Sequence, residues 1–275
     1  MNLLNLIVQL IFFLFGSGDN TQSTLHLNES THYEAIESHE DSISKVLDFT
    51  TIHFPYFSDE DTVIHHSGFS LRYAEQHQQA YWVSYYLDAS RMVSVAKRSD
   101  NFRSDPHIPS LSATIADYKN SGYDRGHLAP AADMSWSEIT MSESFYFSNM
   151  SPQTPSFNRG IWKKLEEQVR KWVNDSTIIH IATGPILEEG LPYIGPNKVS
   201  IPTYYYKAIL KQTDTDFEGI AFVLKNESSS KPLTDFIITI DSLEQLTQLN
   251  FFHTLPDSIE TRVESTVCIS CWFGE

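Results

Sequence analysis

Runs of aromatic and β-branched residues constrain the fold of this chain more than any other feature of its sequence. The first long run precedes the middle of the chain and the others follow it: Ala80–Leu87, Thr177–Pro185, Thr203–Leu210, Gly219–Leu224 and Asp235–Ile240. Runs of this length and composition predict β-strands. His180 lies inside the second run, so we expect it to be a core histidine.

The segment that begins at Asn158 has a helical period instead. Its apolar residues recur at three- and four-residue spacing: Ile161, Trp162, Leu165, Val169, Trp172 and Val173. A second helix is predicted from Leu243 toward Phe251, capped by Asp241 or Ser242. Strand and helix patterns thus mix without regular alternation, which predicts an α+β fold on an antiparallel or mixed sheet.

The chain begins with an apolar segment, Leu3–Phe15, that is too short to cross a bilayer, since a spanning helix takes roughly 20 residues. Small residues follow it at 16–18, although no Lys or Arg precedes it. We predict a signal peptide over residues 1–18, hence a secreted or periplasmic protein with no stable membrane association after its removal. An uncleaved anchor or a buried helix is the alternative.

Residues 19–50 mix Ser, Thr, His and Glu without a sustained period, which is typical of a polar, acidic linker. The remaining residues, 51–275, are long enough to bury a full core, and 41% of the whole chain is hydrophobic. We therefore expect one domain over residues 51–275.

The formal net charge of −16 argues at first against a nucleic-acid partner, because polyanions are bound by Lys and Arg. The charge is unevenly distributed, however. Residues 1–94 hold 3 basic and 12 acidic side chains, residues 95–175 hold 10 of each, and residues 176–275 hold 6 and 13. More than half of the basic residues lie in under a third of the chain. On charge alone, an exported acidic protein that is simply soluble is an equal alternative.

Two pairs of residues invite a metal or redox interpretation. Cys268 and Cys271 are the only cysteines, which excludes a four-cysteine zinc site, and no βαβ pattern precedes them as a redox motif would need. A disulfide between them is permitted in an exported protein. His65 and His66 adjoin acidic residues 59–61, but adjacent residues of an extended segment point to opposite faces and rarely share one ion.

Most of the chemically useful side chains lie between residues 121 and 166. The stretch Ser121–Pro130 contains Asp124-Arg-Gly-His127, in which His127 can take a proton from water near neutral pH. Gly126, between the arginine and the histidine, allows the backbone to approach a ligand closely. This stretch is the candidate active site.

Two later stretches, Phe145–Gln153 and Asn158–Glu166, add oxygen ligands. The amide oxygens of Asn149 and Asn158 are hard ligands of the kind that Mg²⁺ prefers, and Glu166 adds a carboxylate. Asn158 also stands where a helix N-cap belongs, and that structural role competes with metal binding.

Cationic side chains flank these stretches. Arg125 and Arg159 lie within them, and the polar loop upstream carries Lys97, Arg98 and Arg103. Guanidinium groups bind phosphate bidentately, so the cluster indicates a phosphate-binding site. Taken alone, the upstream loop would indicate only a solvated surface.

Together these blocks resemble the DNA/RNA non-specific endonucleases, the ββα-metal (His-Me finger) nucleases that include mitochondrial endonuclease G. The resemblance covers roughly residues 62–260. It rests on ordered blocks at the family's spacing: Asp124–His127, Ser148–Gln153, Asn158 with Trp162 and Leu165–Glu166, Thr183–Pro185 and Ile238–Asp241. It implies a ββα-metal core on a mixed or antiparallel central sheet with flanking helices.

The resemblance implies a role for each matching residue. His127 matches the general base, and Asn158 matches the direct ligand of Mg²⁺, with Mn²⁺ as an alternative ion. Glu166 matches the carboxylate that holds metal-bound water. Asn149 matches an amide that supports the base and the scissile phosphate, and Arg125 matches a cation on the phosphate side.

A further family arginine matches Arg98, with Arg103 as the alternative. Asp124 and Arg159 are assigned to substrate binding. Family members often carry Asn-Gln-Gly or Asn-Gln-Asn after the metal ligand, whereas this chain has Asn158-Arg159-Gly160, which adds charge beside the metal site.

We therefore predict an exported, Mg²⁺-dependent endonuclease that hydrolyses DNA and RNA with little sequence specificity, and a homodimer is compatible with this prediction. By resemblance, its products carry 5′-phosphate and 3′-hydroxyl ends. Two alternatives remain open. One is a catalytically weak protein that binds nucleic acid or phosphate on the same fold, and the other is a phosphodiesterase or phosphatase of small molecules.

Overall fold

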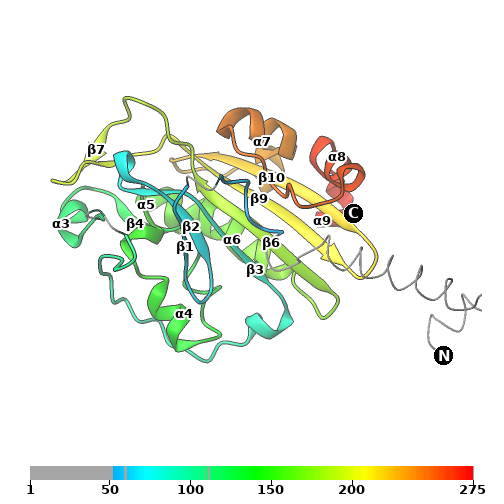
Figure 1. Ribbon diagram of the computed structural model, residues 1–275, viewed down its shortest axis with the longest axis horizontal. Coiled ribbons are helices and arrows are strands. Elements are labelled where there is room, and N and C mark those ends of the chain that lie inside the picture. The colour runs from blue at the N-terminus through cyan, green and yellow to red at the C-terminus, as the bar shows by residue number, and fades with distance from the viewer. Residues whose placement is uncertain (1–51, 59–60, 109, 111, 275) are drawn as a thin grey trace, which may run out of the picture. The chain divides into compact units, whose positions relative to one another are not determined.

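A seven-stranded antiparallel sheet lies at the centre of the fold (Figure 1). Its strands, in spatial order, are β1 (Val63–His65), β2 (Ser70–Ala74), β3 (Gln79–Leu87), β6 (Thr177–Pro185), β9 (Tyr204–Thr213), β10 (Phe217–Lys225) and β11 (Ile237–Ile238). All neighbouring strands of this sheet pair antiparallel. The predicted α+β class is confirmed, and of the two expected sheet types the antiparallel one is present.

The computed structural model describes residues 52–58, 61–108, 110 and 112–274. These residues all belong to one unit, Val46–Glu275. The predicted signal peptide and linker, residues 1–50, lie outside the described residues. Within the described part of the chain, no helix combines the length and the hydropathy that a membrane span requires.

The last predicted strand is wrong over most of its length. Only Ile237–Ile238 pairs with β10, because Leu233–Phe236 forms a 3₁₀ turn and the helix α7 (Ile240–Thr247) begins directly after Thr239. The Thr239 hydroxyl accepts a hydrogen bond from the Ser242 amide at 3.1 Å, so the helix cap precedes the predicted Asp241 or Ser242. A β-branched residue in an apolar run is typical of a strand, but Thr is also a strong N-cap.

The two faces of the sheet carry separate cores. Neighbouring residues of β9 alternate between them: Ile209 packs with Leu165 of helix α6 (Lys163–Lys171), and Leu210 belongs to the core that includes Leu243 of α7. Helix α8 (Asp257–Ser265) contributes Val263 to the second core. Helix α6 therefore covers one face of the sheet, and helices α7 and α8 cover the other.

Shorter elements complete the described chain. Two small antiparallel pairs are formed by β4 (Asp124–His127) with β5 (Met150–Gln153) and by β7 (Tyr193–Ile194) with β8 (Val199–Ser200). The remaining α-helices are α3 (Ile115–Tyr118), α4 (Glu138–Glu143), α5 (Pro155–Phe157) and α9 (Ile269–Phe273), and 3₁₀ turns lie at Glu75–His77, Ala89–Met92 and Phe147–Asn149. Cys268 and Cys271 form the disulfide that the sequence permitted, at the start of α9.

Three histidines outside the candidate site, His65, His66 and His180, have structural partners. His180 is buried in β6, with Nε2 2.8 Å from Gln212 Oε1, which confirms it as a core residue. His65 and His66 diverge as predicted: His65 Nδ1 lies 2.8 Å from Ser70 Oγ and His66 Nε2 lies 2.9 Å from Asp105 Oδ2. Of the acidic residues considered with them, 59 and 60 lie outside the described residues.

Candidate active site

The motif Asp124–His127 forms β4 and pairs antiparallel with β5, so that Gly126 stands opposite Ser151 and His127 opposite Met150. Gly126 is required by packing rather than by a ligand, because a Cβ there would overlap the side chain of Gln153. The small size of Gly126 thus has a packing reason within the β4–β5 pair, and its role beside a ligand stays a prediction. The pair delivers the histidine at the end of a short, fixed strand.

His127 lies against two aromatic rings. Its ring centroid is 4.9 Å from that of Phe145 and 5.9 Å from that of Phe102, both edge-on. Burial, reinforced by the positive charges of Arg98 and Arg125, lowers the pKa of His127 to about 3. The imidazole is therefore neutral at neutral pH, which is the form that can accept a proton.

Asn149 is fully buried and its amide group is fully engaged. Its Oδ1 accepts from the backbone amide of Ala129 at 2.9 Å, and its Nδ2 donates to the carbonyls of Ala129 and Ser144, each at 2.9 Å. The Asn149 carbonyl also accepts from the amide of Leu128 at 3.0 Å. Asn149 thus fixes the backbone that directly follows His127, in keeping with a supporting role for the base.

Asn158 lies in a single π-helical segment, Asn158–Trp162, between α5 and α6. The N-cap interpretation is wrong, because the helical path begins at Pro155 and the Asn158 amide already donates to the carbonyl of Thr154 at 2.9 Å. Gly160 departs from helical geometry, with φ −106° and ψ −112°. The regular α-helical spacing assumed between Asn158 and Glu166 therefore does not hold.

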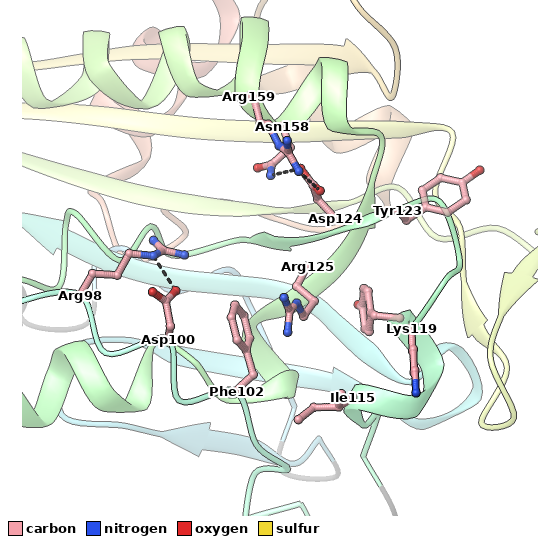
Figure 2. Close-up of a pocket in the computed structure, with 11 residues that line it drawn as sticks. Arg98, Asp100, Phe102, Ile115, Lys119, Tyr123, Asp124, Arg125, Asn158 and Arg159 are labelled. Carbon is pink, nitrogen blue, oxygen red and sulfur yellow. Dashed lines mark hydrogen bonds and ion pairs between the residues drawn. The ribbon is translucent and has the colours of Figure 1, made fainter.

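The carboxylate of Asp124 determines which way the Asn158 amide points. Asn158 Nδ2 donates to Asp124 Oδ2 at 2.9 Å, and Arg159 donates to both Asp124 oxygens at 2.8 and 2.6 Å (Figure 2). Burial opposes ionisation, but these hydrogen bonds outweigh it and lower the pKa of Asp124. With its nitrogen held by Asp124, the amide oxygen of Asn158 is the atom that could bind a metal ion.

Glu166 is half-buried in the first turn of α6. Burial raises the pKa of this carboxyl, while the Lys207 ammonium opposes the shift and Asp133 adds to it. Lys207 is fully buried in β9, where its Nζ donates to Thr183 Oγ1 at 3.2 Å and lies 4.7 Å from the Trp162 ring centroid.

Sequence reasoning missed this buried network. Beside Lys207 it contains Asp133, which accepts from Arg170 at 2.6 Å and from the Tyr85 hydroxyl at 2.8 Å. The available signal was a lysine inside the apolar run Thr203–Leu210, since charged residues are rarely fully buried without a partner.

The arginines near the site differ in how far their guanidinium groups are bound to other side chains and carbonyls. Arg103 is engaged: its guanidinium donates to Ser142 O at 2.8 Å and to Ser142 Oγ at 3.1 Å, and it lies 3.9 Å from the Tyr146 ring centroid. Arg125 is exposed and rests on the Phe102 ring at 4.0 Å. Arg98 is half exposed and pairs with Asp100 at 2.7 Å. Of the two upstream candidates, Arg98 is the one that faces an open pocket.

That pocket has a volume of about 460 Å³ and brings the predicted site residues together. Figure 2 shows the cationic and amide groups around it. Its lining includes Arg98, Asp100, Phe102, Tyr123, Asp124, Arg125, Asn158 and Arg159, together with Ile115, Tyr118 and Lys119 at the end formed by α3. His127 is not among these lining residues, but it contacts the pocket wall through Phe102. The geometry is that of a cationic cleft above a neutral histidine.

Two short strands followed by a helix, with a histidine in the first strand and an asparagine at the helix entry, have the arrangement of a ββα-metal nuclease. The model of the DNA/RNA non-specific endonuclease family matches residues 46–258, so the chain belongs to that family. The resemblance seen in the sequence motifs is confirmed.

Individual relatives agree with this assignment. The chain is 33% identical over 222 residues to Nuclease C1 of Cunninghamella echinulata, covering 72% of this chain and 87% of that protein. It is 33% identical over 199 residues to human mitochondrial endonuclease G, covering 67% of each. It is 34% identical over 202 residues to the zebrafish mitochondrial nuclease EXOG, covering 67% of this chain and 59% of that protein. The chain thus spans less than two thirds of this last relative.

A solved structure shows the same fold. A chain in the crystal structure of the EndoG/EndoGI complex, described as showing the mechanism of EndoG inhibition, aligns with a TM-score of 0.69 and 30% identity. The alignment covers 76% of this chain and 92% of that chain.

Proposed function

We propose that this protein is an exported endonuclease that hydrolyses phosphodiester bonds of DNA and RNA, with Mg²⁺ as its cofactor and His127 as its general base. The observation that carries the proposal is a neutral, half-buried imidazole whose pKa is lowered by burial and by Arg98 and Arg125, two arginines that line the open cleft. Such a site attracts the phosphate anion while it keeps the base unprotonated.

The residues present fit a hydrated Mg²⁺ ion. Asn158 offers a free amide oxygen because Asp124 holds its nitrogen. Glu166 offers a carboxylate from the first turn of α6, the helix that follows the Asn158–Trp162 segment. Mg²⁺ keeps several waters and takes one or two protein ligands with substrate phosphate. When bound, the ion would stabilise the charge that develops on the phosphate and the leaving oxygen.

The chain's own residues then have distinct tasks. His127 takes a proton from the attacking water, and Arg98 and Arg125 hold phosphate oxygens. Asp124 accepts from both Asn158 and Arg159, so we assign it to positioning these groups rather than to direct substrate contact. Arg159 contributes positive potential at the rim of the cleft, and Arg103 holds its own segment to Ser142 of α4.

The test compares plasmid DNA, single-stranded RNA and bis(p-nitrophenyl) phosphate as substrates, each with Mg²⁺, with Mn²⁺ and with EDTA. We expect both polymers to be cleaved and EDTA to stop the cleavage. Polymer binding without turnover would identify a catalytically weak binding protein instead. Turnover confined to the small diester would identify a small-molecule phosphodiesterase.

Export is a separate part of the proposal, supported by the apolar segment Leu3–Phe15 and the small residues after it. The relatives named above include mitochondrial proteins. N-terminal sequencing of the mature protein from its native source decides the matter. A new N-terminus near residue 19 in an extracytoplasmic fraction supports export, and an intact Met1 in the cytosolic fraction contradicts it.

A further inference from the structure

Helices α7 and α8 bring three carboxylates together on the face of the sheet opposite α6. One carboxylate oxygen from each of Asp241, Glu244 and Glu264 can be chosen so that all three lie within 4.8 Å of one another. Asp241 and Glu244 are three residues apart on α7 and therefore share a helix face. Glu264 comes from the last turn of α8.

The cluster lacks a positive partner. Among the described ion pairs none involves these three residues, and their side chains accept a hydrogen bond from the Phe251 amide, which donates to Glu244 Oε1 at 2.7 Å. Glu264 is only 6% exposed, and its Oε1 has no hydrogen-bond partner among the described residues. A buried carboxylate oxygen in this state is costly, because burial removes water without replacing its hydrogen bonds.

Packing holds the carboxylates in this arrangement. Val263, next to Glu264, is buried in the core, and its carbonyl lies so close to Gly219 of β10 that a Cβ at Gly219 would overlap it. Leu243, next to Glu244, is buried in the same core. The helices α7 and α8 lie beside β10 in Figure 1. Because both helices are anchored next to their carboxylates, the three groups cannot separate without loss of core packing.

We propose that Asp241, Glu244 and Glu264 bind a Ca²⁺ ion that holds α7 to α8, at a site separate from the nuclease cleft. Ca²⁺ takes six to eight oxygen ligands in flexible geometry, and three carboxylates can supply several of them while water supplies the rest. Asp241 and Glu244 are partly exposed, which gives the ion an entry path. Mg²⁺ is disfavoured because it demands a smaller, regular octahedron.

Burial, together with repulsion from Glu244, Glu260 and Asp241, raises the pKa of Glu264 to about 8. A bound cation would offset this repulsion and lower the pKa of Glu264, because a nearby opposite charge favours the ionised carboxylate.

Thermal unfolding and calorimetric titration with CaCl₂ test the proposal on metal-free protein. We expect Ca²⁺ to raise the melting temperature with a dissociation constant of about 10⁻⁴ to 10⁻³ M, the range of extracellular calcium modules. The variant Glu264→Gln should bind at least about ten times more weakly. The control Asp257→Asn removes an exposed carboxylate from the same helix and should respond like the wild type.

Three results would overturn the site. The first is an unchanged melting temperature and no binding heat in wild-type protein at millimolar Ca²⁺, which would mean that the carboxylates share protons. The second is an equal response of Glu264→Gln and wild type. The third, should that variant not fold, is an undiminished response of Asp241→Asn. The variant Asn158→Ala should keep the full Ca²⁺ response, because it removes the proposed Mg²⁺ ligand of the cleft and leaves the cluster intact, so that this outcome stays independent of the proposed nuclease site.

Discussion

The nuclease cleft and the α7–α8 carboxylate cluster gather charged side chains of opposite sign. In the cleft, Arg98 and Arg125 face open solvent and the desolvated group, His127, is neutral. In the cluster, the desolvated group is Glu264, which is itself one of the three carboxylates. Solvent and salt screen exposed cations, so the arginines of the cleft cost little stability when no anion is bound. The buried carboxylate has no such screening and depends on a proton or a cation.

The largest expected effect is in the cleft. His127→Ala should lower the rate of DNA cleavage by about 10² to 10⁴, because a positioned base contributes that much. Initial rates on a labelled duplex measure it. His127→Gln is the control for packing, since it retains bulk beside Phe145 and Phe102 without a comparable base. Retention of more than about a tenth of the wild-type rate in either variant would contradict the base assignment.

Asn158→Ala should reduce the rate more than about 100-fold, because loss of a direct ligand exceeds the usual 10- to 100-fold cost of losing an outer partner. Asp124→Asn should fall within that lower range, since it disturbs the orientation of Asn158 and the ion pair with Arg159 but removes no direct ligand. The rates are measured over a series of Mg²⁺ concentrations. Equal losses in both variants, with no change in Mg²⁺ dependence, would show that Asn158 is structural.

Glu166→Gln should cost about 10- to 100-fold, with part of the rate restored at high Mg²⁺. The buried Lys207 opposes the raised pKa of Glu166, so the charge of this carboxylate depends on its partner. Full activity of Glu166→Gln at low Mg²⁺ would show that Glu166 has no role in metal binding or catalysis.

The strands and the motif residues could be predicted because their signals are local. Thr177–Pro185 is a strand over its predicted length, and Asp124–His127 is a contiguous motif. The rest depends on contacts between distant segments. Lys207 meets Glu166 only because β9 passes under α6, and Glu264 meets Glu244 only because α8 packs beside α7. Neither contact leaves a periodic or spacing signal in the sequence.

The arginines give a smaller, salt-dependent effect. Binding through phosphates should weaken with salt at a slope of about −0.9 per neutralised phosphate on B-form DNA, and Arg98→Ala should reduce that slope by about 1. Arg103→Ala is the matched control, because its guanidinium is already bound to Ser142. Affinity is measured in Ca²⁺-free, Mg²⁺-free buffer at several salt concentrations. An equal reduction in both variants would place Arg103 on the substrate as well.

The last expected effect is on stability rather than on cleavage, and it separates the cluster from the cleft. The pKa of Glu264 in the folded protein, about 8, lies above its unfolded value of 4.5. The folded state therefore binds more protons between these values, and stability falls as pH rises through that window. In EDTA, Glu264→Gln should abolish this loss and gain about 2 kcal/mol at pH 8, after allowance for screening.

Chemical denaturation of wild type and Glu264→Gln at pH 5 and pH 8, both in EDTA, measures the difference. The gain should be present at pH 8 and nearly absent at pH 5, where the side chain at position 264 is uncharged in both folded proteins. Asp257→Asn should show no such pH-dependent gain, because that carboxylate is exposed. A gain of the same size at both pH values would mean that the Glu264→Gln substitution improves packing, and the uncompensated charge of the cluster would then have no energetic consequence.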